Sequence, residues 1–270
     1  MTTAFVDTTV LTDAVLKPGP RARSALNAIQ TFDRSELPVY AIKEFKAGPL
    51  SYYVWLHNKL SLTGSFRKTA EAIRRMAATP RRNLLRTALE ALEAAANRRG
   101  QLSTGDLVQK YGATASVDRA LADLYRLSLK SLVIGGWRKR RRVTSVVVQE
   151  LSCYEEEDPR VSTVIELGKA KCNAAPECSL AAALKAKPED LKKLRAAIPT
   201  GGRIEDARRS QALRQLIRRP GLPLDAKTCV HLGDAIFAFF APAGSTILTT
   251  NVRDHGPLAE SLGKTARSPE

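Results

Sequence analysis

The stretch AFVDTTVL, residues 4–11, decides the fold of this chain. Apolar residues are followed by Asp7 and two threonines, which is the pattern of a short buried strand that ends on a carboxylate. Thr8 or Thr9 can then cap a helix that runs on to Leu16. Ligands of open α/β sheets bind at the carboxyl ends of the strands, so Asp7 is a candidate metal ligand. The alternative is that Asp7 only caps the first helix, because Asp is a common N-cap.

The composition points to an anionic partner. The chain has 270 residues, enough for a large core in one or two domains. It carries 43 Lys and Arg against 27 Asp and Glu, a formal net charge of +16. Nucleic acid is the leading partner for such a charge, and an anionic membrane surface is the second. Neither end carries a strongly basic amphipathic segment, and aromatic residues make up only 6%, so platforms for stacking bases are few.

The cysteines and the N-terminus indicate a cytoplasmic protein without a membrane segment. The four cysteines form no C-x-x-C pair, so a zinc site is not expected and the thiols are expected to be reduced. No basic segment followed by an apolar run opens the chain, which argues against a signal peptide. No apolar run approaches the ~18 residues that span a bilayer. The cysteines are Cys153, Cys172, Cys178 and Cys229.

The next segments repeat the alternation of helix and strand. A helix is expected over residues 21–32, followed by a short strand over residues 37–41. Another helix begins at residues 42–45 and is interrupted by Gly48 and Pro49. Glu44 lies in the expected first turn of this helix. It is a second candidate site acid, although the helix dipole alone would favour a carboxylate there.

A basic helical region fills the middle of the chain. Residues 65–149 hold 18 Lys and Arg against 6 Asp and Glu, a net charge of +12. Helices are expected over 65–79, 82–99 and 116–130, and an extended segment over 143–151. Residues 103–113 with 116–130 also fit a helix-turn-helix, although many helical hairpins look the same. The densest cationic run is a candidate phosphate-binding patch, against the alternative of a solvated charge run. It consists of Trp137, Arg138, Lys139, Arg140, Arg141 and Arg142.

The C-terminal quarter supplies further candidate ligands. Residues 188–190 are expected to open a helix, and residues 203–219 form a basic helix. Asp225 is expected to cap a helix that continues through residue 240, and the segment after Asp234 is almost entirely apolar. An acid at such a border is costly unless it is paired or bound to a metal, so Asp234 is the third candidate. His231 is expected to be a surface or supporting imidazole rather than a ligand.

A second strand also ends on polar side chains. Residues 246–250 are rich in β-branched residues and are followed by Asn251 and Asp254. Either residue can add an oxygen ligand at the same edge. A helix over 257–262 and a polar tail are expected to complete the chain.

Taken in order, these segments resemble the PIN domain family, which includes toxin ribonucleases of the VapC type. The resemblance rests on four short motifs: Phe5-Val6-Asp7-Thr8, Glu44 by position, Gly233-Asp234-Ala235-Ile236, and Leu248-Thr249-Thr250-Asn251. It implies an α/β fold with a doubly wound parallel sheet. Residues 1–60 and 220–264 would form the nuclease core, residues 61–219 a basic and mainly α-helical insertion, and residues 265–270 a tail.

The resemblance implies a metal-dependent endoribonuclease. Asp7, Glu44 and Asp234 would be catalytic and would bind Mg²⁺ or Mn²⁺ together with Asn251 or Asp254, and hard oxygen ligands suit these ions. A metal-activated water would hydrolyse the phosphodiester bond. RNA is the expected substrate, and the function would be that of a toxin or defence effector. A protein inhibitor or antitoxin and a second copy in a homodimer are the protein partners implied.

Two departures from the family pattern keep alternatives open. The fourth acidic position is occupied by Asn251, which would reduce the charge that holds a second ion. A segment of about 160 residues, 61–219, lies between the second and third motifs, and the resemblance does not explain it. The alternatives are a DNA nuclease with the same site and a catalytically weak nucleic-acid-binding or regulatory protein.

Overall fold

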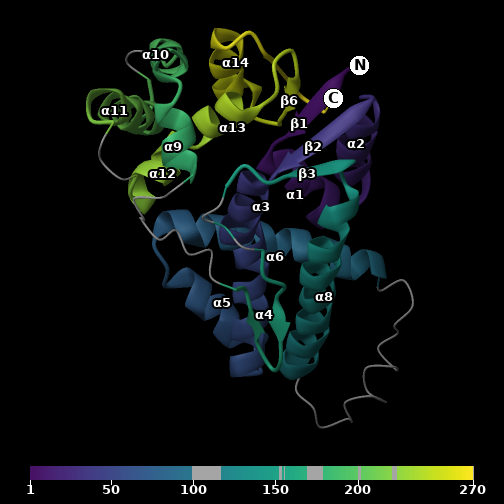
Figure 1. Ribbon diagram of the computed structural model, residues 1–270. Coiled ribbons are helices and arrows are strands. Elements are labelled where there is room, and N and C mark those ends of the chain that lie inside the picture. The colour runs from purple at the N-terminus through teal and green to yellow at the C-terminus, as the bar shows by residue number, and fades with distance from the viewer. Residues whose placement is uncertain are drawn as a thin grey trace.

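The protein is built on a five-stranded, all-parallel sheet (Figure 1). The computed structural model describes residues 1–98, 117–151, 154, 156–168, 179–199, 202–220 and 224–269. The strand order is β3-β2-β1-β6-β7, so the predicted α/β fold with a parallel sheet is confirmed. The strands are β1 (Thr3–Val6), β2 (Arg34–Pro38), β3 (Val146–Val148), β6 (Thr246–Leu248) and β7 (Thr265–Arg267).

The strand that carries the opening motif lies at the centre of the sheet. Phe5 of β1 is in register with Glu36 of β2 on one side and with Ile247 of β6 on the other. From β1 the chain adds β2 and β3 on one side, and from β6 it adds β7 on the other side. The direction in which strands are added therefore reverses between β1 and β6. The backbone amide of Asp7 donates to the carbonyl of Leu248 at 3.0 Å, which joins the two strand ends. This reversal is where open α/β sheets bind their ligands.

Helices cover both faces of the sheet. α1 (Thr8–Leu16) and α2 (Gly19–Gln30) connect β1 to β2, whereas α14 (Val252–Ser261) connects β6 to β7. These two crossovers run in opposite directions along the sheet, and right-handed connections therefore put their helices on opposite faces. The buried core between the layers includes Phe5, Leu11 and Phe237, each at most 1% exposed.

A helical bundle forms most of the connection from β2 to β3. α3 (Val39–Phe45), a π-helix (Lys46–Leu50) and α4 (Ser51–Thr63) follow one another without a break. The interruption expected at Gly48 and Pro49 is therefore wrong, because the wider π-turn accommodates the proline. α4 packs against α5 (Phe66–Arg74), α6 (Ala78–Arg98) and α8 (Val117–Lys139), and these helices lie together below the sheet in Figure 1. A 3-10 turn (Arg140–Arg142) leads from α8 toward β3.

A second group of helices lies beside the C-terminal edge of the sheet. It contains α9 (Ser179–Lys185), α10 (Pro188–Ala196), α11 (Ile204–Arg218), α12 (Ala226–Leu232) and α13 (Asp234–Phe240). α11 packs against α10 and α12, and α10 also contacts α14. A small antiparallel pair, β4 (Arg160–Val161) and β5 (Ile165–Glu166), lies against α4. The helices expected at residues 188–190 and 203–219 are thus confirmed.

Several expected boundaries differ from the structure. The segment 61–219 is not purely an insertion, because its β3 pairs with β2 in the main sheet. The residues expected to form a tail, 265–270, contain β7, which pairs with β6. The last helix begins at Val252 rather than at residue 257, since Pro257 sits inside it. The first helix of the suggested helix-turn-helix, 103–113, and three of the four cysteines (Cys153, Cys172 and Cys178) lie outside the described residues.

The helices that the structure describes include none that is both long enough and apolar enough to cross a bilayer.

Candidate active site

Asp7 lies at the reversal point of the sheet and is 3% exposed. Its carboxylate accepts from the backbone amide of Thr8 at 2.6 Å, so Asp7 itself is the N-cap of α1. The expectation that Thr8 or Thr9 caps this helix is therefore wrong. The hydroxyls of Thr9 and Thr249 donate to Oδ2 of Asp7 at 2.6 and 2.8 Å. These bonds, from α1 and from the residue after β6, hold the carboxylate in one orientation.

Glu44 lies near Asp7 but in a different helical position from the one expected. It is the penultimate residue of α3, and because α3 continues through the π-helix into α4, Glu44 lies inside a longer helix rather than in a first turn. Its Oε2 accepts from the hydroxyl of Thr8 at 2.8 Å, and the Tyr40 hydroxyl also interacts with the Glu44 carboxyl. Burial, followed by the charge of Asp7, raises the pKa of Glu44 to about 7. Asp234 also raises it.

Asp234 reaches the site because the expected continuous helix is broken. Gly233 has φ +39° and ψ −115°, which separates α12 from α13 and makes Asp234 the first residue of α13. Its Oδ2 accepts from Nη2 of Arg209 on α11 at 2.5 Å. Burial raises the pKa of Asp234, but the hydrogen bond from His255 and the charges of His255 and Arg209 outweigh burial and lower it overall.

His255 joins the first and third acids. It lies on α14, is 1% exposed, and packs its ring edge-to-face on Phe237 with centroids 5.5 Å apart. Its Nε2 is 3.3 Å from Oδ1 of Asp234 and 3.7 Å from Oδ2 of Asp7. Burial lowers the pKa of His255, but the bond to Asp234 and the charge of Asp7 raise it above its ordinary value overall. The imidazole therefore partly compensates the buried Asp7 carboxylate and the half-buried Asp234 carboxylate.

The two candidates for the fourth position form a separate cluster. The amide nitrogen of Asn251 donates to Oδ2 of Asp254 at 2.9 Å. The other oxygen of Asp254 accepts from the guanidinium of Arg203, which lies at the start of α11. Asn251 is tied back to β6 by its backbone amide, which donates to the Thr249 hydroxyl at 3.0 Å. These bonds join Asn251 and Asp254 to each other, to Thr249 and to α11.

The structure therefore brings Asp7, Glu44 and Asp234 into electrostatic contact, as their charge coupling shows. Carboxylate oxygens are the donors that suit Mg²⁺ or Mn²⁺. Within the described ranges, however, no three His, Cys, Asp or Glu side chains form a group arranged to hold a metal ion. Arg209 and His255 instead contact the oxygens of Asp234. A divalent cation would have to compete with these two side chains.

Sequence reasoning missed Arg209, His255 and Thr249. Thr249 lies inside the fourth motif and His255 follows Asn251 by four residues, so the neighbourhood of both was visible in the sequence. The Thr249 hydroxyl reaches Asp7 because β6 pairs with β1, and His255 reaches Asp234 because α14 packs on α13. Arg209 gave no such signal, because it is one of many cations on a basic helix and its place is set by packing of α11 on α12.

The cationic run at the end of α8 is only partly exposed. Trp137 is 2% exposed and its indole donates to Asp158 at 2.7 Å, so in this structure it offers no stacking surface. Arg140 is 1% exposed, stacks over the Trp137 ring with its guanidinium carbon 3.3 Å from the centroid, and pairs with Glu156. The exposed cations of the run are Arg138, Lys139, Arg141 and Arg142.

Comparisons with known proteins add no relative: no family model matches the chain, and no curated protein or solved structure matches it significantly.

Proposed function

We propose that the protein is a metal-dependent nuclease that cleaves RNA at the acidic edge formed by Asp7, Glu44 and Asp234. The position of Asp7 carries this proposal: its carboxylate is buried and fixed at the reversal point between β1 and β6. This is the ligand-binding place of open α/β sheets. The similarity of the four motifs to PIN ribonucleases supports RNA as the substrate.

The electrostatics of the site support a cation as its partner. Burial, together with the negative charges of Asp7 and Asp234, raises the pKa of Glu44 to about 7. A divalent cation would relieve this repulsion, and Asp7, Glu44 and Asp234 would hold it. When bound, such an ion lowers the pKa of a water molecule and neutralises charge on phosphoryl oxygens.

The remaining side chains have positioning roles in this proposal. Thr9 and Thr249 fix the Asp7 carboxylate, and Thr8 fixes Glu44, so the acids keep their places without a ligand. Arg209 and Arg203 place positive charge beside the acids, where a polyanion would otherwise be repelled.

A second candidate function is that of a catalytically weak nucleic-acid-binding protein. The ion pair between Arg209 and Asp234 at 2.5 Å favours it, because this pair already neutralises one acid of the site. In that case the basic surface would bind nucleic acid and the acids would serve the fold. Competition by Mn²⁺ for Asp234 distinguishes the two candidates.

The test is incubation of the full chain with RNA, single-stranded DNA and duplex DNA, in Mg²⁺ or Mn²⁺ and in EDTA. Cleavage of RNA is expected with metal only, and Asp7→Asn and Asp234→Asn should abolish it while circular dichroism remains unchanged. Asp33→Asn, at an exposed hydrogen-bonded turn, is the matched control and should cleave normally. Undiminished cleavage in both site variants would refute the assignment. Salt-sensitive binding without cleavage would favour the second candidate.

A further inference from the structure

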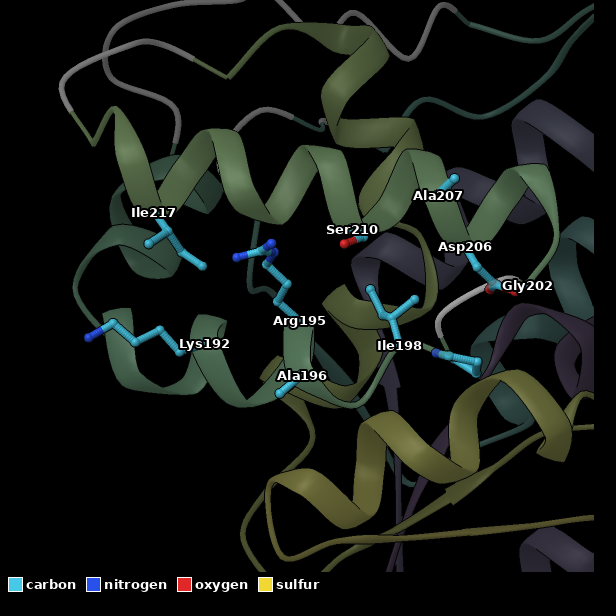
Figure 2. A pocket seen from close by; sticks show the side chains of 10 residues that line it. Lys192, Arg195, Ala196, Ile198, Gly202, Asp206, Ala207, Ser210 and Ile217 are labelled. Carbon is cyan, nitrogen blue, oxygen red and sulfur yellow. The ribbon is translucent and has the colours of Figure 1, made fainter.

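A groove of about 770 Å³ lies between α10 and α11 (Figure 2). Ile198 and Ile217 line it together with Ala196 and Ala207, so much of its wall is apolar. Arg195 reaches from α10 toward α11 across the groove, with Lys192 near one end and Asp206 near the other. The groove thus combines an apolar wall with cations on the α10 side.

The charge of the groove is positive. Asp206 is the acidic lining residue, and Arg203 and Arg209 lie 3.7 and 3.5 Å from its carboxylate, which neutralises it. Arg214 lies seven residues after Ala207 on α11, hence on the same flank of that helix, and it is exposed. In the part of the chain that the structure describes, neither Arg195 nor Arg214 forms an ion pair. Two cations are therefore available to an anionic ligand.

The groove leads to the acidic edge. From Asp206 to Ile217 it follows α11 for about 16 Å, at 1.5 Å for each residue. Asp206 pairs with Arg209, which in turn pairs with Asp234. Arg203, one turn before Asp206, pairs with Asp254. A chain lying in the groove would thus have one end next to the acids at the carboxyl edge of the sheet.

We propose that the groove between α10 and α11 binds a single-stranded segment of nucleic acid, with Arg195 and Arg214 at its phosphates and the apolar wall against its bases. This inference rests on the proposed function for its choice of ligand, since an acidic peptide would offer negative charge but no bases for the apolar wall. It places substrate binding beside the acids, on α11, rather than on the cationic run at the end of α8.

The experiment measures binding of a fluorescently labelled single-stranded RNA to the full chain by anisotropy, in EDTA, over a range of salt concentrations. The test variant is Arg195→Gln with Arg214→Gln. Each lost phosphate contact lowers the salt slope by about 0.7, so the double variant should lose about 25-fold in affinity at about 0.1 M salt. The matched control, Lys68→Gln with Arg82→Gln, removes two exposed cations of the helical bundle and should lose far less.

A second variant tests the groove rather than the charge. Ala207 is exposed on α11, so Ala207→Trp fills the groove without changing charge or a buried residue. It should also weaken RNA binding by at least several-fold. Equal losses in the test and control double variants, or full affinity in Ala207→Trp, would overturn the proposal. Tighter binding of an acidic peptide of equal charge would overturn the choice of nucleic acid.

The assay separates this proposal from the proposed function. Binding is measured in EDTA and does not depend on cleavage. Loss of binding in the groove variants without any metal-dependent cleavage in the parent chain would uphold the groove and refute the nuclease. Cleavage that depends on Asp7 but is unaffected by the groove variants at low RNA concentration would uphold the nuclease and refute the groove as its RNA-binding site.

Discussion

Replacing Glu44 with glutamine should change how the stability of the protein depends on pH. Burial and the charge of Asp7 raise the pKa of this carboxyl from 4.5 to about 7. Between these two values the folded protein retains a proton that the unfolded chain has lost. The free energy of unfolding therefore falls as the pH rises through this window. A glutamine has no proton to lose, so the variant lacks this decrease.

The magnitude follows from the two pKa values. A difference of one pKa unit corresponds to about 1.36 kcal/mol, so the raised pKa of Glu44 costs at most about 3 kcal/mol above pH 7. Part of the side chain is solvent-accessible, which makes this an upper bound. Relative to the parent chain, Glu44→Gln should gain up to this amount between about pH 4 and about pH 8.

Urea unfolding in EDTA, followed by circular dichroism at several pH values, measures the effect. Glu71→Gln, which removes a carboxylate from an exposed face of α5, is the matched control. Added Mn²⁺ at the highest pH should stabilise the parent chain more than Glu44→Gln, because an ion bound by the folded state stabilises it. A stability difference between Glu44→Gln and the parent that is the same at both ends of the pH range would refute this reasoning.

Three substitutions test the backbone that positions the site. Gly233→Ala puts a Cβ at φ +39° and should destabilise the protein by about 1–3 kcal/mol. The control is Gly256→Ala, whose added Cβ has no contact within 4 Å and which should cost less. Urea unfolding compares the free energies of unfolding of the two variants. Gly136→Val places its Cβ 2.6 Å from a side-chain carbon of α1, whereas the Cβ of Gly135→Val meets nothing within 4 Å. Gly136→Val should therefore destabilise the protein by about 1–3 kcal/mol more than Gly135→Val. Equal melting temperatures of the two variants would contradict this packing. Asp225→Ala removes the cap of α12 and should cost about 1 kcal/mol, while Asp225→Asn, which keeps a cap oxygen, should stay close to the parent in thermal unfolding.

Local sequence patterns were sufficient for the elements that form the centre of the fold. An apolar run, an acid and two hydroxyl residues predict β1 and α1. Acids in the first turn predict the starts of α10 and α11, together with a proline in α10. β7 was missed because Thr265 and Arg267 are exposed, so the strand lacks an apolar signal; it exists because β6 offers it backbone partners.

The site was predictable only as a set of acids. Asp7 stands at the end of a strand and Asp234 at the border of an apolar segment, and both features can be read from the order of residues. The break at Gly233 could not be read from the sequence, because a glycine inside a helical pattern is compatible with a continuous helix. The ion pair of Arg209 depends on packing between helices distant in sequence, so the compensation of Asp234 by a cation was not foreseen.

Binding of Mn²⁺ tests the central claim most directly. Electron paramagnetic resonance measures the free ion during titration of the full chain, with Asp7→Asn as the site variant and Asp33→Asn as its control. We expect the parent and Asp33→Asn to bind Mn²⁺ with equal affinity and Asp7→Asn to lose this binding. Absence of binding in the parent chain, or equal binding in Asp7→Asn, would contradict a metal site at the acidic edge of the sheet.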